Sequence, residues 1–215
     1  MTIVWVGDAN APEFAMLRAA GGANVARAED LEGAFALRDR QTAGFVLSAA
    51  WATAGLRRAE LADGLARAVG YADCLAFAGG LPGAYGFCAR VAGLVQAVRE
   101  GVGQTYVASD AVIVGSGCEA WASLAAATQL RASSLALATP DAVTSAVAHR
   151  LGVELAHPSG RTDDANLVFD AHGPAVRVGN VAIGRAAIAL HTVATQVRLL
   201  TSKEPDIEAM RRACG

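Results

Sequence analysis

The spacing of apolar residues along this chain changes repeatedly between the period of a β-strand and that of an α-helix. Short apolar runs bounded by polar or glycine residues predict strands, and apolar residues three and four positions apart predict helices. The predicted strands cover 2–6, 24–28, 44–48, 73–77, 110–114, 134–138, 167–169 and 175–178. The predicted helices cover 12–20, 31–40, 57–69, 91–99, 118–129, 141–151, 184–200 and 206–212. This alternation predicts an α/β fold with a mainly parallel sheet.

The stretch 110–121 combines a short apolar strand, a glycine turn and an alanine-rich helix. Gly115 and Gly117 permit a tight turn and close approach of a ligand to the backbone, and Ala120 permits close packing of helix on strand. The N-terminus of the helix could then hold a pyrophosphate. A strand-to-helix turn that serves packing alone would have the same sequence, so both interpretations stay open.

Composition narrows the classes of protein. The chain has 215 residues, of which 53% are hydrophobic and 18% charged, with a net charge of −2. This length suffices for one large or two small domains, and the near-zero charge predicts binding neither to nucleic acid nor to an anionic membrane. Glu119 and Arg185 interrupt the longest apolar runs before they reach the roughly 18 residues of a membrane span. We therefore expect a soluble, cytoplasmic protein.

The cysteines and the lysine content limit the chemistry. Cys74, Cys88, Cys118 and Cys214 are widely spaced and form no Cys-x-x-Cys pair, which favours free, mostly buried thiols over zinc sites or disulfides. Lys203 is the only lysine in the chain. A mechanism that needs a catalytic lysine must therefore use Lys203.

One group of residues has the composition of a metal site. His157, Asp163, Asp164, Asp170 and His172 lie close together in the sequence. A polar loop between strands accounts for these residues more simply than coordination does. We therefore expect no metal.

Three blocks carry a resemblance to a known family. The block 65–74 is similar to a run that ends in Gly-Ala-Val-Asn-Thr, and 86–95, with Gly93, is similar to Gly-Tyr-Asn-Thr-Asp-x-x-Gly. The segment 189–210 is similar to a helix containing Leu-Val-His-Gln-Ala and the tail that follows it. These blocks resemble the shikimate dehydrogenases, and the glycine turn at Gly115 falls where that family has its nucleotide loop.

The resemblance implies both a fold and an activity. It implies a substrate-type α/β domain over 1–100, a reduced Rossmann-like domain over 101–185, and C-terminal helices over 186–215 that return to the first domain. Members of the family reduce 3-dehydroshikimate with NADPH in aromatic amino acid biosynthesis. A lysine, oriented by an aspartate, handles the hydroxyl proton, and burial with a charge partner sets the pKa of such a base.

This sequence departs from the family at the positions that carry the chemistry. Where the family has Thr-x-Pro-x-Lys, the chain has 48–55, Ser-Ala-Ala-Trp-Ala-Thr-Ala-Gly, without a lysine. Arg90 stands at the position of the catalytic aspartate, Asp73 at that of the substrate-binding asparagine, and Thr192 at that of the C-terminal glutamine. The residues 8–12 replace the paired serines that hold the substrate carboxylate. A structural ion pair between Asp73 and Arg90 is the expectation for this couple.

The nucleotide side also departs from the family. The segment 135–141 that ends the second Rossmann strand has no arginine for the 2′-phosphate of NADP. Glu119, in the first helical turn, opposes the approach of a pyrophosphate. The region 168–184 is short for the remaining strands and helices. We therefore expect NADP binding that is weak or lost. The candidate cofactor-binding residues are Gly115, Ser116, Gly117, Cys118 and Ala120.

Three functional hypotheses follow from this pattern. The first is a shikimate-dehydrogenase-like pseudoenzyme that binds a small molecule or a protein partner in the altered cleft. The alternative is an active NADP-dependent oxidoreductase with rearranged catalytic residues. A third is a different enzyme that uses Asp73, Arg90 or Cys88. The many alanine and valine residues leave apolar helix faces that could form a homodimer.

Overall fold

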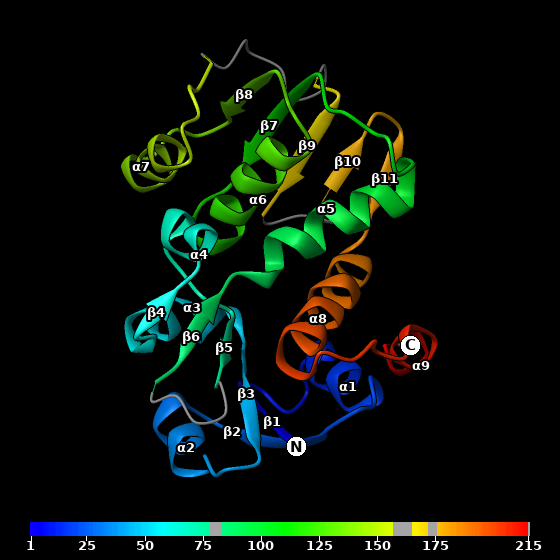
Figure 1. The fold of residues 1–215 in the computed structure, drawn as a ribbon. Coiled ribbons are helices and arrows are strands. Elements are labelled where there is room, and N and C mark those ends of the chain that lie inside the picture. The colour runs from blue at the N-terminus through cyan, green and yellow to red at the C-terminus, as the bar shows by residue number, and fades with distance from the viewer. Residues whose placement is uncertain (78–82, 157–164, 172–175, 215) are drawn as a thin grey trace. The chain divides into compact units, whose positions relative to one another are not determined.

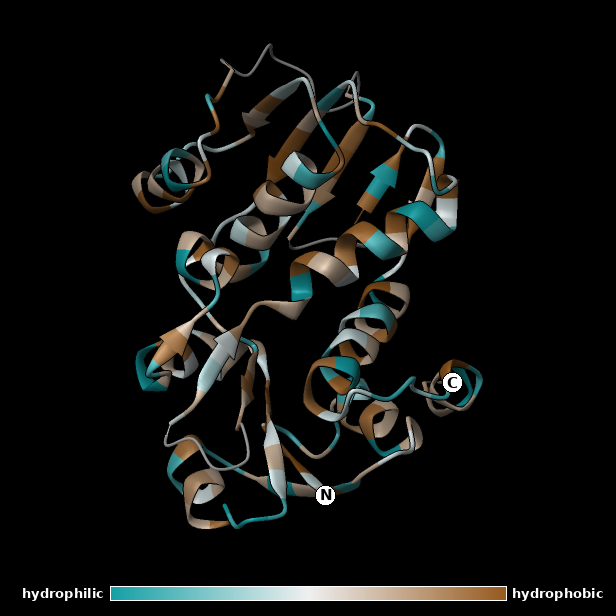
Figure 2. Cartoon of the chain, viewed as in Figure 1, coloured by the Kyte–Doolittle hydropathy of each residue, from teal (hydrophilic) through white to brown (hydrophobic). Residues whose placement is uncertain are grey.

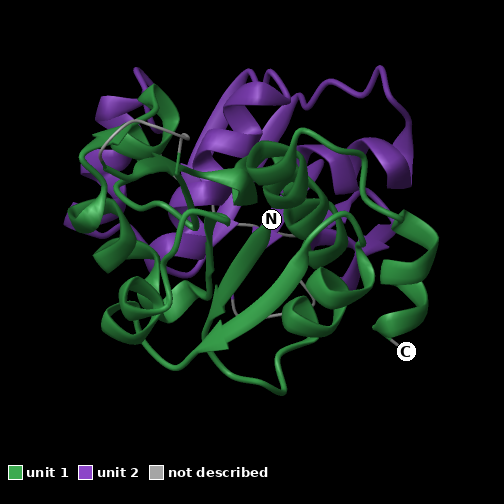
Figure 3. Ribbon diagram, turned by 60° about the horizontal axis from the view of Figure 1, so that its bottom comes forward, with its two compact units in different colours: residues 1–93, 189–215 green, residues 94–188 purple. Residues whose placement is uncertain are grey.

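The computed structural model describes residues 1–77, 83–156, 165–171 and 176–214. The chain divides into two compact units, which are coloured separately in Figure 3. Unit 1 consists of Met1–Gly93 and Ala189–Gly215, and unit 2 consists of Leu94–Ile188. The last helices of the chain therefore return to the N-terminal unit, as the sequence predicts for a shikimate-dehydrogenase-like fold.

Unit 1 is built on one mixed sheet with the strand order β2-β1-β3-β5-β6-β4. Its strands are β1 Thr2–Val6, β2 Asn24–Ala28, β3 Thr42–Leu47, β4 Leu61–Ala62, β5 Cys74–Ala76 and β6 Tyr85–Phe87. Its helices are α1 Pro12–Ala19, α2 Leu31–Ala36, α3 Ala49–Arg58, α4 Gly64–Val69 and α9 Ile207–Ala213. Figure 1 labels these elements.

Unit 2 contains a second sheet, with the strand order β11-β10-β9-β7-β8. Its strands are β7 Asp110–Val114, β8 Ser134–Leu137, β9 Leu167–Asp170, β10 Val176–Val178 and β11 Val181–Ile183. Its helices are α6 Gly117–Gln129 and α7 Ala142–Arg150. The central strands β7 and β9 are apolar over most of their length, as Figure 2 shows. The indole Nε1 of Trp121 donates to Thr144 Oγ1 at 3.2 Å and thereby joins α6 to α7.

The sheets are less parallel than the sequence pattern predicts. In each sheet three strands run parallel, β2-β1-β3 in unit 1 and β8-β7-β9 in unit 2. The strands β5 and β6, like β10 and β11, pair antiparallel with the strands before them. For the pairs β5–β6 and β10–β11 the reason lies in the connections, because a parallel crossover needs a dozen or more residues. The segments 77–84 and 179–180, which join β5 to β6 and β10 to β11, are too short for one.

The helix predicted over 57–69 is wrong, because this segment holds the end of one helix and the whole of another. The helix α3 ends at Arg58, the short strand β4 then pairs with β6, and α4 begins only at Gly64. The carboxylate of Asp63 caps α4 by accepting the Ala66 N–H at 2.6 Å. The Asp63 cap and the pairing of β4 with β6 therefore interrupt the helix, although the residues between α3 and α4 favour helix formation.

The core of unit 1 joins the first strands to the last long helix. Ile3 and Trp5 of β1, together with Val46 of β3, form one buried cluster with α8 (Arg185–Thr201). The buried residues that α8 contributes are Ala189, Leu190, Val193, Ala194, Val197 and Leu200. The helix α9 packs on α1, and Met210 completes the cluster.

Two helices belong to both units. The helix α5 (Ala89–Val102) begins in unit 1 and ends in unit 2, and α8 begins in unit 2 and ends in unit 1. The chain therefore passes from one unit to the other twice, each time inside a helix. Among the described residues, none of the helices combines the length and apolar character that a membrane span requires.

Candidate functional site

The candidate site of unit 1 is centred on Asp73, the residue before β5. Its side chain is buried, with 6% of its surface exposed. One carboxylate oxygen accepts the Ala89 N–H at 2.8 Å, and the other accepts the Arg90 N–H, also at 2.8 Å. Both amides belong to the first turn of α5, where backbone N–H groups lack acceptors within the helix. Asp73 therefore caps α5 from a neighbouring strand.

The charge environment of Asp73 follows from this position. Burial raises its pKa from 3.8 to about 6, because desolvation disfavours the charged form. The hydrogen bonds from the Ala89 and Arg90 amides oppose this rise, as does the positive charge of Arg90. The sequence suggests an Asp73–Arg90 ion pair. In the structure the two residues meet through the backbone of Arg90, and its guanidinium adds a favourable charge.

The main chain of Asp73 is also fully engaged. Its carbonyl oxygen accepts the Leu47 N–H of β3 at 2.9 Å and the Gln196 Nε2–H of α8 at 3.2 Å. Its own N–H donates to the carbonyl of Phe87 at 3.0 Å. Gln196 is 3% exposed, so this amide is buried against the sheet. Sequence analysis missed Gln196, although a glutamine on the apolar face of a helix is a signal for such a bond.

Thr192, at the family position of the C-terminal glutamine, packs where α5 and α8 meet. A Cβ placed on Gly93 would lie 2.8 Å from both the Cα and the backbone N of Thr192. Such distances are below any ordinary van der Waals contact, so only glycine permits this approach of the two helices. Gly93, which the family resemblance retains, thus has a packing role here.

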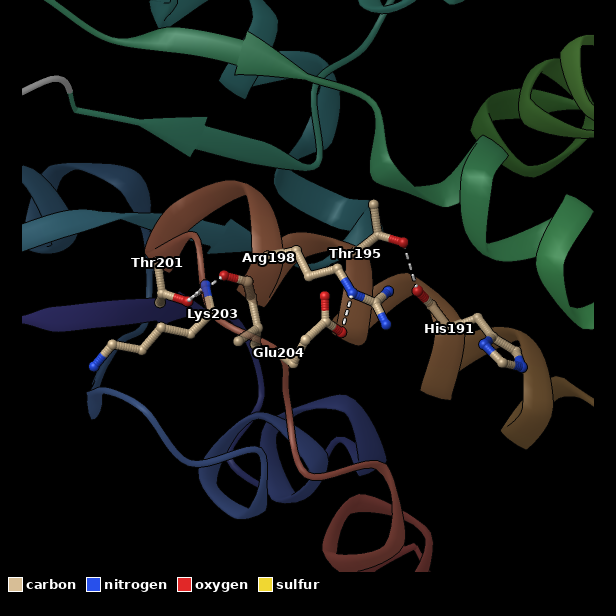
Figure 4. Close-up of polar contacts among 7 residues, drawn as sticks. His191, Thr195, Arg198, Thr201, Lys203 and Glu204 are labelled. Atoms are coloured by element: carbon tan, nitrogen blue, oxygen red, sulfur yellow. Dashed lines mark hydrogen bonds and ion pairs between the residues drawn. The ribbon is translucent and has the colours of Figure 1, made fainter.

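The structure places no lysine near Asp73. The family's Thr-x-Pro-x-Lys aligns with 48–52, so its lysine position is Ala52, which is buried in α3 at 1% exposure. The amine of Lys203 instead lies 3.5 Å from the carbonyl oxygen of Gly22, on the exposed connection between α8 and α9. Figure 4 shows this amine pointing away from the neighbouring Arg198–Glu204 ion pair, whose atoms are 2.8 Å apart.

The two cysteines beside Asp73 are poor nucleophiles. Cys74 and Cys88 are buried, and burial raises the pKa of both thiols well above the ordinary value. The β5–β6 register pairs Cys74 with Phe87, and Cys74 and Cys88 are both free thiols. This arrangement supplies neither a thiolate nor a dithiol pair.

The residues 8–12, which replace the paired serines, form a turn after β1. The Asp8 carboxylate accepts the Asn10 N–H at 2.9 Å, and the Asp8 carbonyl accepts the Trp5 indole N–H at 2.9 Å. The Arg27 Nε–H donates to the Gly7 carbonyl at 2.9 Å. Asp8 itself is exposed. The turn thus presents an acidic side chain at the carboxyl end of β1.

The candidate site of unit 2 is the glycine turn between β7 and α6. Gly115 and Gly117 have φ values of +105° and +76°, which favour glycine. A Cβ on Gly117 would meet nothing within 4 Å, so its backbone is open to approach. Ser116 is the N-cap of α6 and makes no side-chain cap bond, while Ala120 is completely buried. These four residues fit a turn that holds a phosphate group at a helix N-terminus.

Other residues of unit 2 limit what this turn could hold. Cys118 and Glu119, in the first turn of α6, are partly exposed. Asp141, after β8, caps α7 by accepting the N–H groups of Val143 at 3.0 Å and Thr144 at 2.8 Å. A hydrogen bond with the Thr144 side chain, followed by the Thr144 amide, holds the pKa of Asp141 below 3.8. An acid after the second strand of a Rossmann-like domain could bind the ribose of a dinucleotide. Here the carboxylate of Asp141 instead caps α7.

The residues considered for a metal site are only partly described. His157, Asp163, Asp164 and His172 lie outside the described residues. Asp170 is the last residue of β9. Within the described segments, histidine, cysteine and carboxylate side chains form no group of three that could hold a metal ion.

Comparison with known proteins defines the class of fold. No protein-family model and no curated protein sequence matches the chain. Among solved structures, quinate dehydrogenase from Corynebacterium glutamicum, in complex with NAD, has a TM-score of 0.77 at 18% identity. The alignment covers 99% of this chain and 96% of that one. The chain therefore has a two-domain α/β dehydrogenase fold.

Two further structures show which dehydrogenase fold it is. Shikimate dehydrogenase from Mycobacterium tuberculosis has a TM-score of 0.78 at 16% identity, over 99% of this chain and 97% of that one. The 5-ketofructose reductase of Gluconobacter sp. strain CHM43 has a TM-score of 0.79 at 15% identity, over 99% and 96%. The shikimate dehydrogenase-like fold inferred from the three sequence blocks is thus confirmed.

Proposed function

We propose that this chain is a shikimate-dehydrogenase-like binding protein that no longer reduces 3-dehydroshikimate. One observation carries the proposal: the residues at the family's substrate-binding asparagine position and in its catalytic lysine segment are part of the fold itself. The carboxylate of Asp73 accepts two backbone amides of α5, and Ala52 is a buried alanine. Lys203, the only lysine of the sequence, lies on the exposed α8–α9 connection.

Proton transfer at a substrate hydroxyl needs a group with a free acceptor or donor within hydrogen-bond reach. Asp73 is buried and each of its oxygens holds a main-chain amide of α5, so proton transfer at this carboxylate would weaken the start of that helix. Cys88 is buried with a raised pKa, and thus offers no thiolate in its place. Asp73 and Cys88 therefore give little support to the third hypothesis, a different enzyme that uses Asp73, Arg90 or Cys88.

The glycine turn of unit 2 supports a remaining ability to hold a dinucleotide. Nicotinamide dinucleotides supply the hydride in enzymes of this fold class, and here the α6 amides and Ser116 would hold the pyrophosphate. The residues 138–148 contain no arginine or lysine that could pair with a 2′-phosphate. We therefore expect weak binding that does not favour NADPH over NADH.

The test is a pair of titrations with NADPH and NADH, followed by a turnover assay with 3-dehydroshikimate. We expect dissociation constants within about threefold of each other and no turnover. Lys203→Ala is a matched variant, because an exposed lysine outside the site leaves all three measurements unchanged. Turnover faster than about 1 per second, typical of enzymes, would refute the loss of activity. Turnover that Lys203→Ala abolishes would place that lysine in the mechanism.

The alternative function, an active oxidoreductase with rearranged residues, has one observation in its favour. The glycine turn keeps its positive φ angles and its open backbone, although no packing partner requires this of Gly117. Saturable NADPH binding together with slow turnover of a related cyclic ketone would favour this alternative. Binding without turnover of any such ketone favours the binding protein.

A further inference from the structure

Asp73 contacts both of the helices through which the chain passes between its units. Its carboxylate holds the Ala89 and Arg90 amides at the start of α5, at 2.8 Å each. Its carbonyl oxygen accepts the Gln196 side chain of α8 at 3.2 Å. The same carbonyl is tied to β3 through Leu47, and the Asp73 N–H is tied to the carbonyl of Phe87 in β6. One residue thus links two strands to two helices.

Both helices continue across the boundaries between the units. The division falls after Gly93, one turn into α5, and before Ala189, one turn into α8. The first turn of α5 and the segment of α8 around Gln196 both lie in unit 1, as Asp73 does. A continuous helix transmits the direction of its anchored end along its whole length.

We propose that Asp73, Ala89, Arg90 and Gln196 form a clamp that fixes the direction in which α5 and α8 leave unit 1. The inference stands apart from the proposed function, because it needs neither ligand nor turnover. In this role Asp73 is a positioning residue. The positive charge of Arg90 attracts the Asp73 carboxylate. The neutral thiols of Cys74 and Cys88 flank this carboxylate.

Close packing supports the clamp one turn further along. Gly93 lies against the backbone of Thr192, so α5 and α8 touch with no side chain between them. Thr192 and Gln196 are four residues apart and therefore lie on the same face of α8. The Gly93–Thr192 contact sets the separation of the helices, while Asp73 sets where each is attached to the sheet. Loss of the Asp73 carboxylate should therefore loosen α5, and loss of the Gln196 side chain should loosen α8.

Hydrogen exchange of the full chain, measured by mass spectrometry, tests whether Asp73 holds both α5 and α8. In Asp73→Ala we expect exchange to rise about tenfold in the first turn of α5, which loses its cap. Asp73→Ala keeps the carbonyl that accepts the Gln196 side chain, so Gln196→Ala tests the attachment of α8, and we expect it to raise exchange around position 196. The matched control is Asp30→Ala, which removes the exposed cap of α2, where Asp30 accepts the Gly33 N–H at 2.7 Å. This control should raise exchange in α2 alone.

A distance measurement tests the consequence for the units. Spin labels at Leu61→Cys in unit 1 and Val107→Cys in unit 2, both exposed positions, report the spread of inter-unit distances. Cys118→Ser and Cys214→Ser remove the half-buried thiols that would compete for the label. We expect Asp73→Ala to broaden the distance distribution and Asp30→Ala to leave it unchanged.

Asp73→Asn keeps the test decisive if Asp73→Ala does not fold, because asparagine retains one acceptor for α5 amides. We expect it to have a smaller effect of the same kind on α5. Two results would overturn the clamp. One is unchanged exchange around position 196 in Gln196→Ala, which would make Asp73 a cap for a single helix. The other is an unchanged distance distribution in a folded Asp73 variant.

Discussion

Replacing Gly93 by alanine is the sharpest single perturbation of this fold. The added Cβ would lie 2.8 Å from the Cα and the backbone N of Thr192. An ordinary van der Waals contact begins only at about 3.4 Å. Backbone atoms of a packed helix cannot rotate away, so α5 and α8 must separate by several tenths of an ångström. Overpacking of this kind costs about 1–3 kcal/mol, and we expect the upper part of that range.

The measurement is equilibrium unfolding in urea, with Gly64→Ala as the matched control. Gly64 begins α4, and a Cβ there would meet nothing within 4 Å, so this change should raise the free energy of unfolding by about 0.4–1 kcal/mol. Adding Thr192→Ala to Gly93→Ala removes the clash with the Thr192 hydroxyl but leaves both backbone contacts at 2.8 Å, so it should recover only part of the loss. Wild-type stability in Gly93→Ala, or full recovery in the double variant, would refute the backbone-contact argument.

Three further predictions concern titration, reactivity and capping. Because the pKa of Asp73 is raised from 3.8 to about 6 on folding, its ionisation opposes folding. The free energy of unfolding of the wild type relative to Asp73→Asn should therefore be highest below pH 3.8 and fall by about 3 kcal/mol as the pH rises through 6; parallel pH profiles would contradict this. Cys74 and Cys88 should stay unmodified by a thiol reagent in the native protein at pH 8 and react on unfolding, and reaction at the native rate of an exposed thiol would count against their burial. Asp141→Ala should lower the free energy of unfolding by about 1 kcal/mol without changing the ratio of NADH to NADPH affinity in titrations, and a changed ratio would assign Asp141 to the ligand.

The amino-acid sequence by itself determined most of the elements of this protein. The long helix α8 has enough turns for its helical period to be unambiguous. Capping residues marked helix starts, as Asp30 does for α2 and Asp141 for α7. The glycine turn at Gly115 was evident because positive φ angles restrict the residue type. Three ordered sequence blocks were enough to indicate the shikimate dehydrogenase-like fold.

Only the tertiary structure decided which strands are antiparallel and what Asp73 does. Strands of two or three residues, such as β4, β6 and β11, are too short to show a period, so their positions depend on their partners. In the same way, the sequence does not determine which groups the side chain of an aspartate contacts. Asp73 became a cap for α5 because the fold brings the amides of Ala89 and Arg90 to within 2.8 Å of it, across 16 and 17 residues of chain. Capping by a residue distant in sequence is a property of packing, and local sequence carries no record of it.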